Sequence, residues 1–184
     1  TYNERDNMAP LLRKIYAGLR TRKLEILVVD DDSPDGTGQA VRALFKEIPV
    51  LKLIVPERRA GLAGALKTGY EAARCDILVS MDADRSFEPD DIERFVRRIE
   101  EGVDLVVGSR HAQGGRYEAK NPTTKLKRLI SRAGNILVPW MTGLSVTDCS
   151  ANFRAMRRGL WAELKCRESG NILLLEMILR AASL

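Results

Sequence analysis

The chain has 184 residues, of which 45% are hydrophobic and 30% are charged. These values are typical of one globular domain with a hydrophobic core, and they exclude a disordered or fibrous chain. The formal net charge of +5 suits an anionic substrate, an anionic membrane surface or nucleic acid, so charge alone does not choose a partner.

The first half of the sequence alternates between helical and strand patterns. Apolar residues spaced three and four apart predict a helix of about 15 residues, with Asp6 as its N-cap. A continuous apolar run then predicts a buried strand that ends at Asp30. Further helices are predicted around 41–48, 61–73 and 92–99, and further strands at 50–55, 76–82 and 104–109. This order predicts an α/β fold with a mostly parallel sheet and helices on both of its faces.

The second half is less regular. Glycine and proline residues predict a loop, followed by a helix over 125–137, a strand over 153–157 and a helix over 173–182. The nearly apolar stretch 135–146 is too short to cross a bilayer, which takes about 20 residues. Three widely spaced cysteines without a C-x-x-C pair favour a reduced, cytosolic chain.

Charged side chains follow three of the predicted strands. Ligands of such sheets bind at the carboxyl ends of the strands. We therefore expect these groups to converge on one site: Asp30 and Asp31, Asp82 and Asp84, and Arg110.

The sharpest local signal is the segment "MDAD". Residues two apart along an extended chain project the same way, so Asp82 and Asp84 can face one hard cation. Mg²⁺ or Mn²⁺ is commonly held by one or two carboxylates together with water and substrate phosphates. Taken alone, the pair is equally compatible with chance or with helix capping.

Several motifs occur together in a recognisable order: "TYNERDN", "VVDDDSPDGT", "GLAGALKTG", "MDAD", "GSRHAQGG", "LISRAGN" and "DCSANFRAMRR". With these motifs the chain resembles the dolichol-phosphate mannosyltransferase branch of the inverting, GT-A-fold family 2 glycosyltransferases, and the likeness runs nearly from end to end. The resemblance implies transfer of a sugar from a nucleotide sugar to a polyprenyl or dolichyl phosphate, with mannose from GDP-mannose favoured. UDP-glucose as donor and a non-lipid acceptor are the alternatives.

The resemblance also implies roles for individual residues. Arg110 would contact the diphosphate or the acceptor phosphate, and its planar guanidinium suits that task. Asp84 and Arg110 would be catalytic, with Asp148 as a third candidate. The nucleoside would lie among Tyr2, Glu4, Val29 and Asp31, and the metal and diphosphate among Asp82, Ala83 and Asp84.

Three assignments keep alternatives open. Asp148 could orient the acceptor or sugar, act as a base, or make a structural contact. Arg132 and Arg154 are candidates for the acceptor phosphate and could equally be surface or ion-pair arginines. Within the acidic cluster, Asp32 and Asp35 are expected to turn the chain and cap the next helix.

A phosphoacceptor receiver domain is the rival from another functional class, because "ILVVDDD" resembles the opening strand of such a domain. It would leave the helix before this strand, the second aspartate of "MDAD" and everything after residue 120 without a role.

The second half also carries a basic stretch. Beside the apolar segment it could lie on an anionic bilayer, or it could be a solvated helix face. A protein peripheral to the cytoplasmic face of a membrane is the expected location, and nucleic acid is not favoured because no aromatic platform accompanies the charge. The basic stretch consists of Arg116, Lys120, Lys125, Lys127, Arg128 and Arg132.

The domain prediction is a single GT-A catalytic domain over 1–184, with a nucleotide-sugar half at 1–110 and an acceptor-side half at 111–184. By likeness to the family, a central strand should precede Thr1 and further basic residues should follow the last helix, so residues 1–184 alone are expected to be poorly stable and inactive. Two departures stand out: Arg85 and Ser86 follow "DAD", and "SANFR" replaces a glycine-rich element.

Overall fold

The structure is a computed structural model, and it describes residues 1–110, 143 and 146–184. The predicted helix over 125–137, the basic stretch with Arg132 and most of the apolar stretch 135–146 lie outside these residues.

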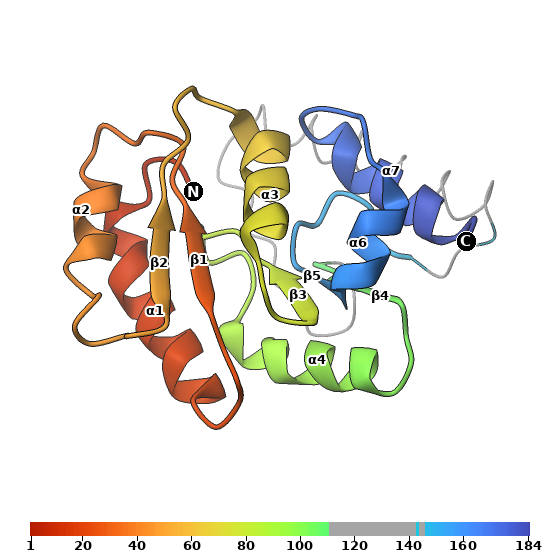
Figure 1. The fold of residues 1–184 in the computed structure, drawn as a ribbon, viewed down its shortest axis with the longest axis horizontal. Helices are drawn as coiled ribbons and strands as arrows, with labels where there is room; N and C mark the ends of the chain where they lie inside the picture. The colour runs from red at the N-terminus through yellow and green to blue at the C-terminus, as the bar shows by residue number, and fades with distance from the viewer. Residues whose placement is uncertain (111–142, 144–145) are drawn as a thin grey trace.

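Helices and strands alternate along the described chain (Figure 1). Their order is α1 Arg5–Leu19, β1 Ile26–Val29, α2 Thr37–Arg42, β2 Leu51–Ile54, α3 Gly61–Ala72, β3 Ile77–Ser80, the 3₁₀ turn η1 Pro89–Asp91, α4 Ile92–Glu100, β4 Leu105–Val107, β5 Arg154–Arg157, α6 Arg158–Leu164 and α7 Ile172–Ala181.

The strands form two hydrogen-bonded groups. β1 pairs in parallel with β2, from Ile26 opposite Leu51 onward. β5 lies between β3 and β4 and is antiparallel to both, so β3 and β4 run in the same direction. The predicted α/β fold with parallel strands is confirmed, whereas the antiparallel position of β5 was not predicted. An antiparallel pair does not need the crossover connection that a parallel pair requires, so the order of helices and strands along the chain does not fix this direction.

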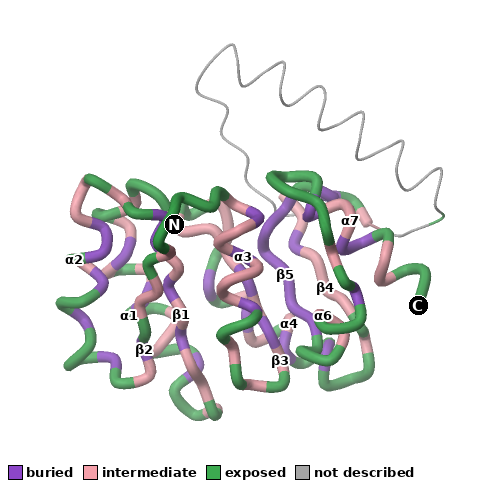
Figure 2. The backbone as a smooth tube through the Cα atoms, turned by 45° about the horizontal axis from the view of Figure 1, so that its top comes forward, coloured by how far each residue is buried: buried purple, intermediate pink, exposed green. Residues whose placement is uncertain are grey.

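Helices cover both faces of the β3–β5–β4 sheet (Figure 1). Because neighbouring strand residues point to opposite faces, Leu78 of β3 packs with the apolar residues of α3, α6 and α7. Ile77 and Val79 pack on the other face with α4 and Phe153. A second core joins α1 and α2 to β1 and β2. Figure 2 shows that buried residues follow the strands while the outer turns are exposed.

Two backbone features bring distant segments to the carboxyl ends of the strands. Thr1 donates to the carbonyl of Val29 and accepts from the amide of Asp31, which places residues 1–4 beside the end of β1. At the end of β4, Gly108 donates to the carbonyl of Phe153 at 2.7 Å. A Cβ on Gly108 would lie 3.0 Å from the Phe153 ring, so a larger residue would be crowded here and glycine suits this close approach.

The remaining differences from prediction are local. α1 has the predicted length of 15 residues, but it begins at Arg5 with Glu4 as N-cap, and Asp6 lies in its first turn. α6 was not predicted, because its seven residues offer too short a periodic pattern. Among the described residues, no helix has both the length and the apolar character needed to cross a membrane.

Candidate active site

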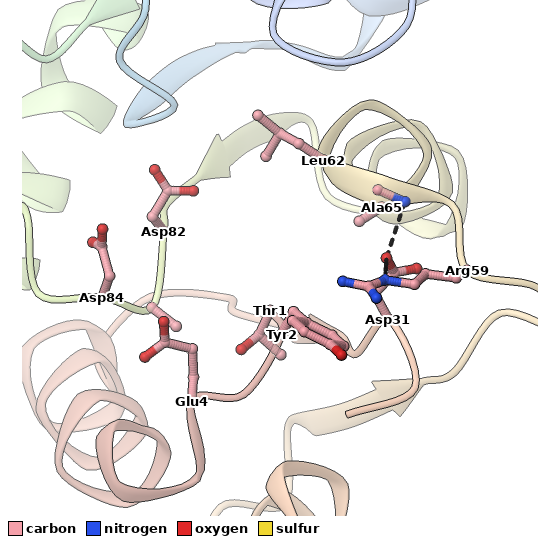
Figure 3. Close-up of a pocket in the computed structure, with 11 residues that line it drawn as sticks. Thr1, Tyr2, Glu4, Asp31, Arg59, Leu62, Ala65, Asp82 and Asp84 are labelled. Carbon is pink, nitrogen blue, oxygen red and sulfur yellow. Dashed lines mark hydrogen bonds and ion pairs between the residues drawn. The ribbon is translucent and has the colours of Figure 1, made fainter. Parts of the chain in front are cut away.

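A cavity of about 290 Å³ opens at the carboxyl ends of β1 and β3 (Figure 3). It joins the end of β1 and the "MDAD" segment after β3, two of the three strand ends that were expected to converge, with the start of the chain, which the resemblance had placed beside the nucleoside. Its lining residues are Thr1, Tyr2, Glu4, Asp31, Arg59, Gly61, Leu62, Ala65, Asp82, Ala83 and Asp84.

Asp82 is the more enclosed of the two aspartates after β3. Its Oδ1 accepts a hydrogen bond of 2.8 Å from Nδ2 of Asn152. Burial raises the pKa of Asp82 above its usual value; the hydrogen bond from Asn152 opposes this rise, and the negative charge of Asp84 adds to it. Asp84 is held from another direction, because its Oδ1 accepts the main-chain N–H of Ser86 at 2.9 Å.

This carboxylate pair fits a divalent cation. Among the described residues no group of three or more His, Cys, Asp and Glu side chains is placed to share a metal. Two carboxylates are nevertheless a common protein contribution to a Mg²⁺ or Mn²⁺ site that is completed by water and substrate phosphates. A cation between Asp82 and Asp84 would also offset the repulsion that raises the pKa of Asp82.

Asp31 lies at the opposite wall of the cavity. Its two carboxylate oxygens accept the main-chain N–H groups of Ala60 at 2.6 Å and Gly61 at 2.9 Å, where α3 begins. The carboxylate therefore stabilises the positive end of α3 while it faces the cavity (Figure 3). The guanidinium of Arg59 stacks 3.7 Å from the centre of the Tyr2 ring and lies 3.5 Å from Asp31.

Two neighbours in the acidic region do not line the cavity. Asp30, which was expected to converge on the same site, is instead buried and accepts a hydrogen bond from the Ser33 hydroxyl. Val29 is also absent from the lining; a Cβ built on Gly69 of α3 would meet its side chain at 3.4 Å. Asp35 caps the start of α2, as predicted, by accepting from both the main-chain N–H and the hydroxyl of Thr37.

Arg110 and Asp148 form an ion pair beside the cavity. Nε and Nη2 of Arg110 donate to the two oxygens of Asp148 at 2.9 and 3.2 Å. Nη2 also donates to the hydroxyl of Ser150 at 2.9 Å. The Asp148 side chain is fully buried. Burial alone would raise the pKa of Asp148, but Arg110 and the hydrogen bond from Ser150 hold it below its usual value.

Arg110 does not line the cavity, although its positive charge acts on Asp82 and opposes part of the rise in the pKa of that carboxyl. Of the alternatives for Asp148, these contacts favour an orienting role, because a carboxylate held in this way is a weak base.

The prediction that Arg154 contacts the acceptor phosphate is wrong. Arg154 is 1% exposed. Nε donates to the carbonyl of Ala151 at 2.7 Å, Nη2 to that of Cys149 at 2.8 Å, and Nη1 to that of Leu174. Burial lowers the pKa of Arg154 to about 10. The guanidinium thus satisfies main-chain carbonyl groups and faces no space in which a phosphate could bind.

Sequence reasoning missed Asn152 and Arg59. Asn152 was noted only as a departure from a glycine-rich element, and nothing in the local sequence pairs it with Asp82 across 70 positions. Arg59 had a weak signal, because it lies two residues before Gly61, where the glycine-rich α3 begins.

Comparison with proteins of known sequence identifies close relatives. The chain is 33% identical over 184 residues to the dolichol-phosphate mannosyltransferase of Pyrococcus furiosus, covering 98% of this chain and 51% of that protein. It is 35% identical over 170 residues to the polyprenol monophosphomannose synthase of Mycolicibacterium smegmatis, covering 86% and 59%. The chain therefore spans little more than half the length of these relatives.

Solved structures of similar fold also include sugar-transferring enzymes. The mannosyltransferase PcManGT of Pyrobaculum calidifontis, in complex with GDP-Man and Mn²⁺, has a TM-score of 0.60 and 26% identity over 90% of this chain and 44% of its own. Glucosyl-3-phosphoglycerate synthase of Mycobacterium tuberculosis has a TM-score of 0.74 and 19% identity, covering 100% and 63%, which shows the fold alone.

The receiver-domain alternative is excluded, because a family model for glycosyltransferases matches most of the chain. The chain belongs to glycosyl transferase family 2, whose model matches residues 1–164.

Proposed function

We propose that the whole protein is an inverting mannosyltransferase that moves mannose from GDP-mannose to a polyprenyl or dolichyl phosphate. One observation carries the proposal: Asp82 and Asp84 share a cavity with Tyr2, Glu4 and Asp31, in a chain whose relatives are named polyprenol-phosphate mannosyltransferases. The names of the relatives and of the solved complex suggest the donor and the acceptor. The cavity provides carboxylates that can hold a metal and accept hydrogen bonds from a nucleotide sugar.

The nucleoside end of the donor lies at the Tyr2 and Asp31 side of the cavity in this proposal. The Asp31 carboxylate is fixed in place by the start of α3, and its oxygens can accept hydrogen bonds from ribose or base donors. Glu4 lies between this side and the aspartate pair (Figure 3). Tyr2 offers a ring at the wall, with Arg59 stacked on it.

Asp82 and Asp84 would hold Mg²⁺ or Mn²⁺, which supplies charge stabilisation for the departing diphosphate. The side chains themselves have separate tasks. Asp82 is fixed by Asn152, and Asp84 by the turn at Ser86. Two carboxylates with fixed orientation would place the metal and diphosphate reproducibly at the carboxyl end of β3. A metal bound in the PcManGT complex is consistent with this assignment.

The reaction needs little base catalysis. A phosphate monoester has a second pKa of about 6, so near neutral pH its oxygen is already an anionic nucleophile. One acceptor oxygen bonds to the anomeric carbon, the bond from that carbon to GDP breaks, and GDP leaves with the electron pair. Arg110 would stabilise phosphate charge, and Asp148 would orient its guanidinium. A single displacement inverts the anomeric centre.

Membrane association belongs to the same proposal. A lipid-linked acceptor places the reaction at a membrane surface, and the donor nucleotide sugar favours its cytoplasmic face. Arg132 remains a candidate for the acceptor phosphate.

The test follows radiolabelled mannose from GDP-mannose into the organic phase with polyprenyl phosphate as acceptor, using the whole protein. We expect label transfer that stops with EDTA and in Asp84→Ala. Asp76→Ala is the matched control, because the Asp76 side chain is 93% exposed. Transfer from UDP-glucose instead would overturn the donor assignment, and transfer without lipid phosphate would overturn the acceptor.

A further inference from the structure

The loop over 148–153 contacts the aspartate pair, because one of its side chains binds Asp82. Asn152 is 4% exposed, and its Nδ2 donates to Asp82 Oδ1 at 2.8 Å. We infer that Asn152 is a positioning residue that fixes the Asp82 carboxylate for binding a divalent cation. This inference rests on the proposed metal role of Asp82.

A second tie fixes the main chain of Asn152 to the strand that carries Asp82. The hydroxyl of Ser80, the last residue of β3, donates to the carbonyl of Asn152 at 2.7 Å. The buried Tyr70 hydroxyl in turn donates to Ser80 Oγ at 2.7 Å. Asn152 is thus bound through both its main chain and its side chain to positions two residues apart, Ser80 and Asp82. Two attachments fix the direction of the amide as well as its distance.

The loop is also anchored by the buried side chain of Arg154. Arg154 donates to the carbonyls of Cys149 and Ala151, on either side of Ser150, and to that of Leu174 in α7. These bonds leave the backbone before Asn152 little freedom to move. The position of the Asn152 amide is therefore set by the fold before any ligand arrives.

The amide itself is satisfied on one side only. Within the described part of the chain, the buried Oδ1 of Asn152 has no hydrogen-bond partner. Turning the amide over would leave its nitrogen at that position and set its oxygen against the Asp82 carboxylate, which would be repulsive. The observed orientation thus serves Asp82 at the expense of the amide oxygen, an arrangement that packing alone does not explain. Partners of metal-binding carboxylates commonly act in this way.

The experiment measures Mn²⁺ binding to the whole protein in the presence of GDP, from the loss of the free Mn²⁺ signal in electron paramagnetic resonance. Asn152→Ala removes the hydrogen bond, and we expect about 10- to 100-fold weaker Mn²⁺ binding. Asn171→Ala is the matched control, because Asn171 is exposed and makes no side-chain cap at the start of α7. Its Mn²⁺ affinity should equal that of the wild type.

Circular dichroism and thermal unfolding of the metal-free proteins show whether each variant is folded. If Asn152→Ala does not fold, Asn152→Ser is measured by the same criterion, since its shorter side chain also cannot span the distance to Asp82. A folded variant that binds Mn²⁺ within twofold of the wild type overturns the inference and leaves the proposed function standing. If the wild type itself binds no Mn²⁺ with GDP, the proposed metal site fails and the inference fails with it.

Discussion

Replacing Arg154 by methionine should destabilise the protein strongly. Methionine fills similar space but cannot donate, so the main-chain carbonyls of Cys149, Ala151 and Leu174 lose the hydrogen bonds that Arg154 donates to them. A hydrogen bond to a charged group contributes about 1.5–3 kcal/mol. Since apolar packing of methionine offsets part of this, we expect the free energy of unfolding to fall by about 3–6 kcal/mol. Lysine should be nearly as poor, because one ammonium cannot reach three carbonyls in three directions.

Urea denaturation of the whole protein, followed by circular dichroism, measures this loss. Arg158→Met is the matched control, because the Arg158 side chain is 50% exposed and lies 3.9 Å from Asp76, and its effect should stay within about 0.5 kcal/mol. Mannose transfer is assayed at a temperature at which both variants are folded. If Arg154→Met kept wild-type stability and lost all transfer, the structural role would be refuted and the acceptor-phosphate role restored.

Three further predictions concern the carboxylates. Asp82→Asn should abolish transfer while raising the free energy of unfolding by about 1 kcal/mol, because a buried charge whose pKa is raised opposes folding; an unchanged or lower melting temperature would contradict this. Asp31→Ala removes the acceptor at the start of α3 and should cost about 1 kcal/mol of stability, with weaker GDP binding in a titration. Hydrogen bonds from Arg22 lower the pKa of Glu93 to about 2, so this pair stabilises the fold above the usual pKa near 4.5 and the contribution is lost as pH falls toward 2. The pair is partly exposed, so Glu93→Gln should remove only about 1 kcal/mol of that pH dependence in acid denaturation.

Local sequence was sufficient for most of the fold. The apolar spacing of α1 and the continuous run of β1 carry their own signals, because burial of one helix face or of a whole strand requires those patterns. The convergence of Asp31 and Asp82 on one cavity also followed from the general rule for strand ends. These features depend on residues near one another in the chain, so they can be read without a structure.

The functions of Arg154 and Asn152 could not be read in this way. An arginine after "SANF" looks the same whether it faces a phosphate or main-chain carbonyls. Which of these partners Arg154 meets depends on α7, because the Leu174 carbonyl in that helix accepts from Arg154 across 20 positions. Likewise Asn152 meets Asp82 because β5 enters the sheet between β3 and β4, and that direction has no signal in the local pattern.

The loop over 148–153 contacts both charged groups that the proposed reaction uses, Arg110 and Asp82. Asp148 at its start holds Arg110, and Asn152 near its end holds Asp82. Arg154 binds two carbonyls between these positions, so both contacts depend on one rigid segment. A displacement of this segment would move Arg110 and Asp82 together. Variants that loosen it should therefore impair donor binding and transfer at once, whereas Asn152→Ala should act on the Asp82 side alone.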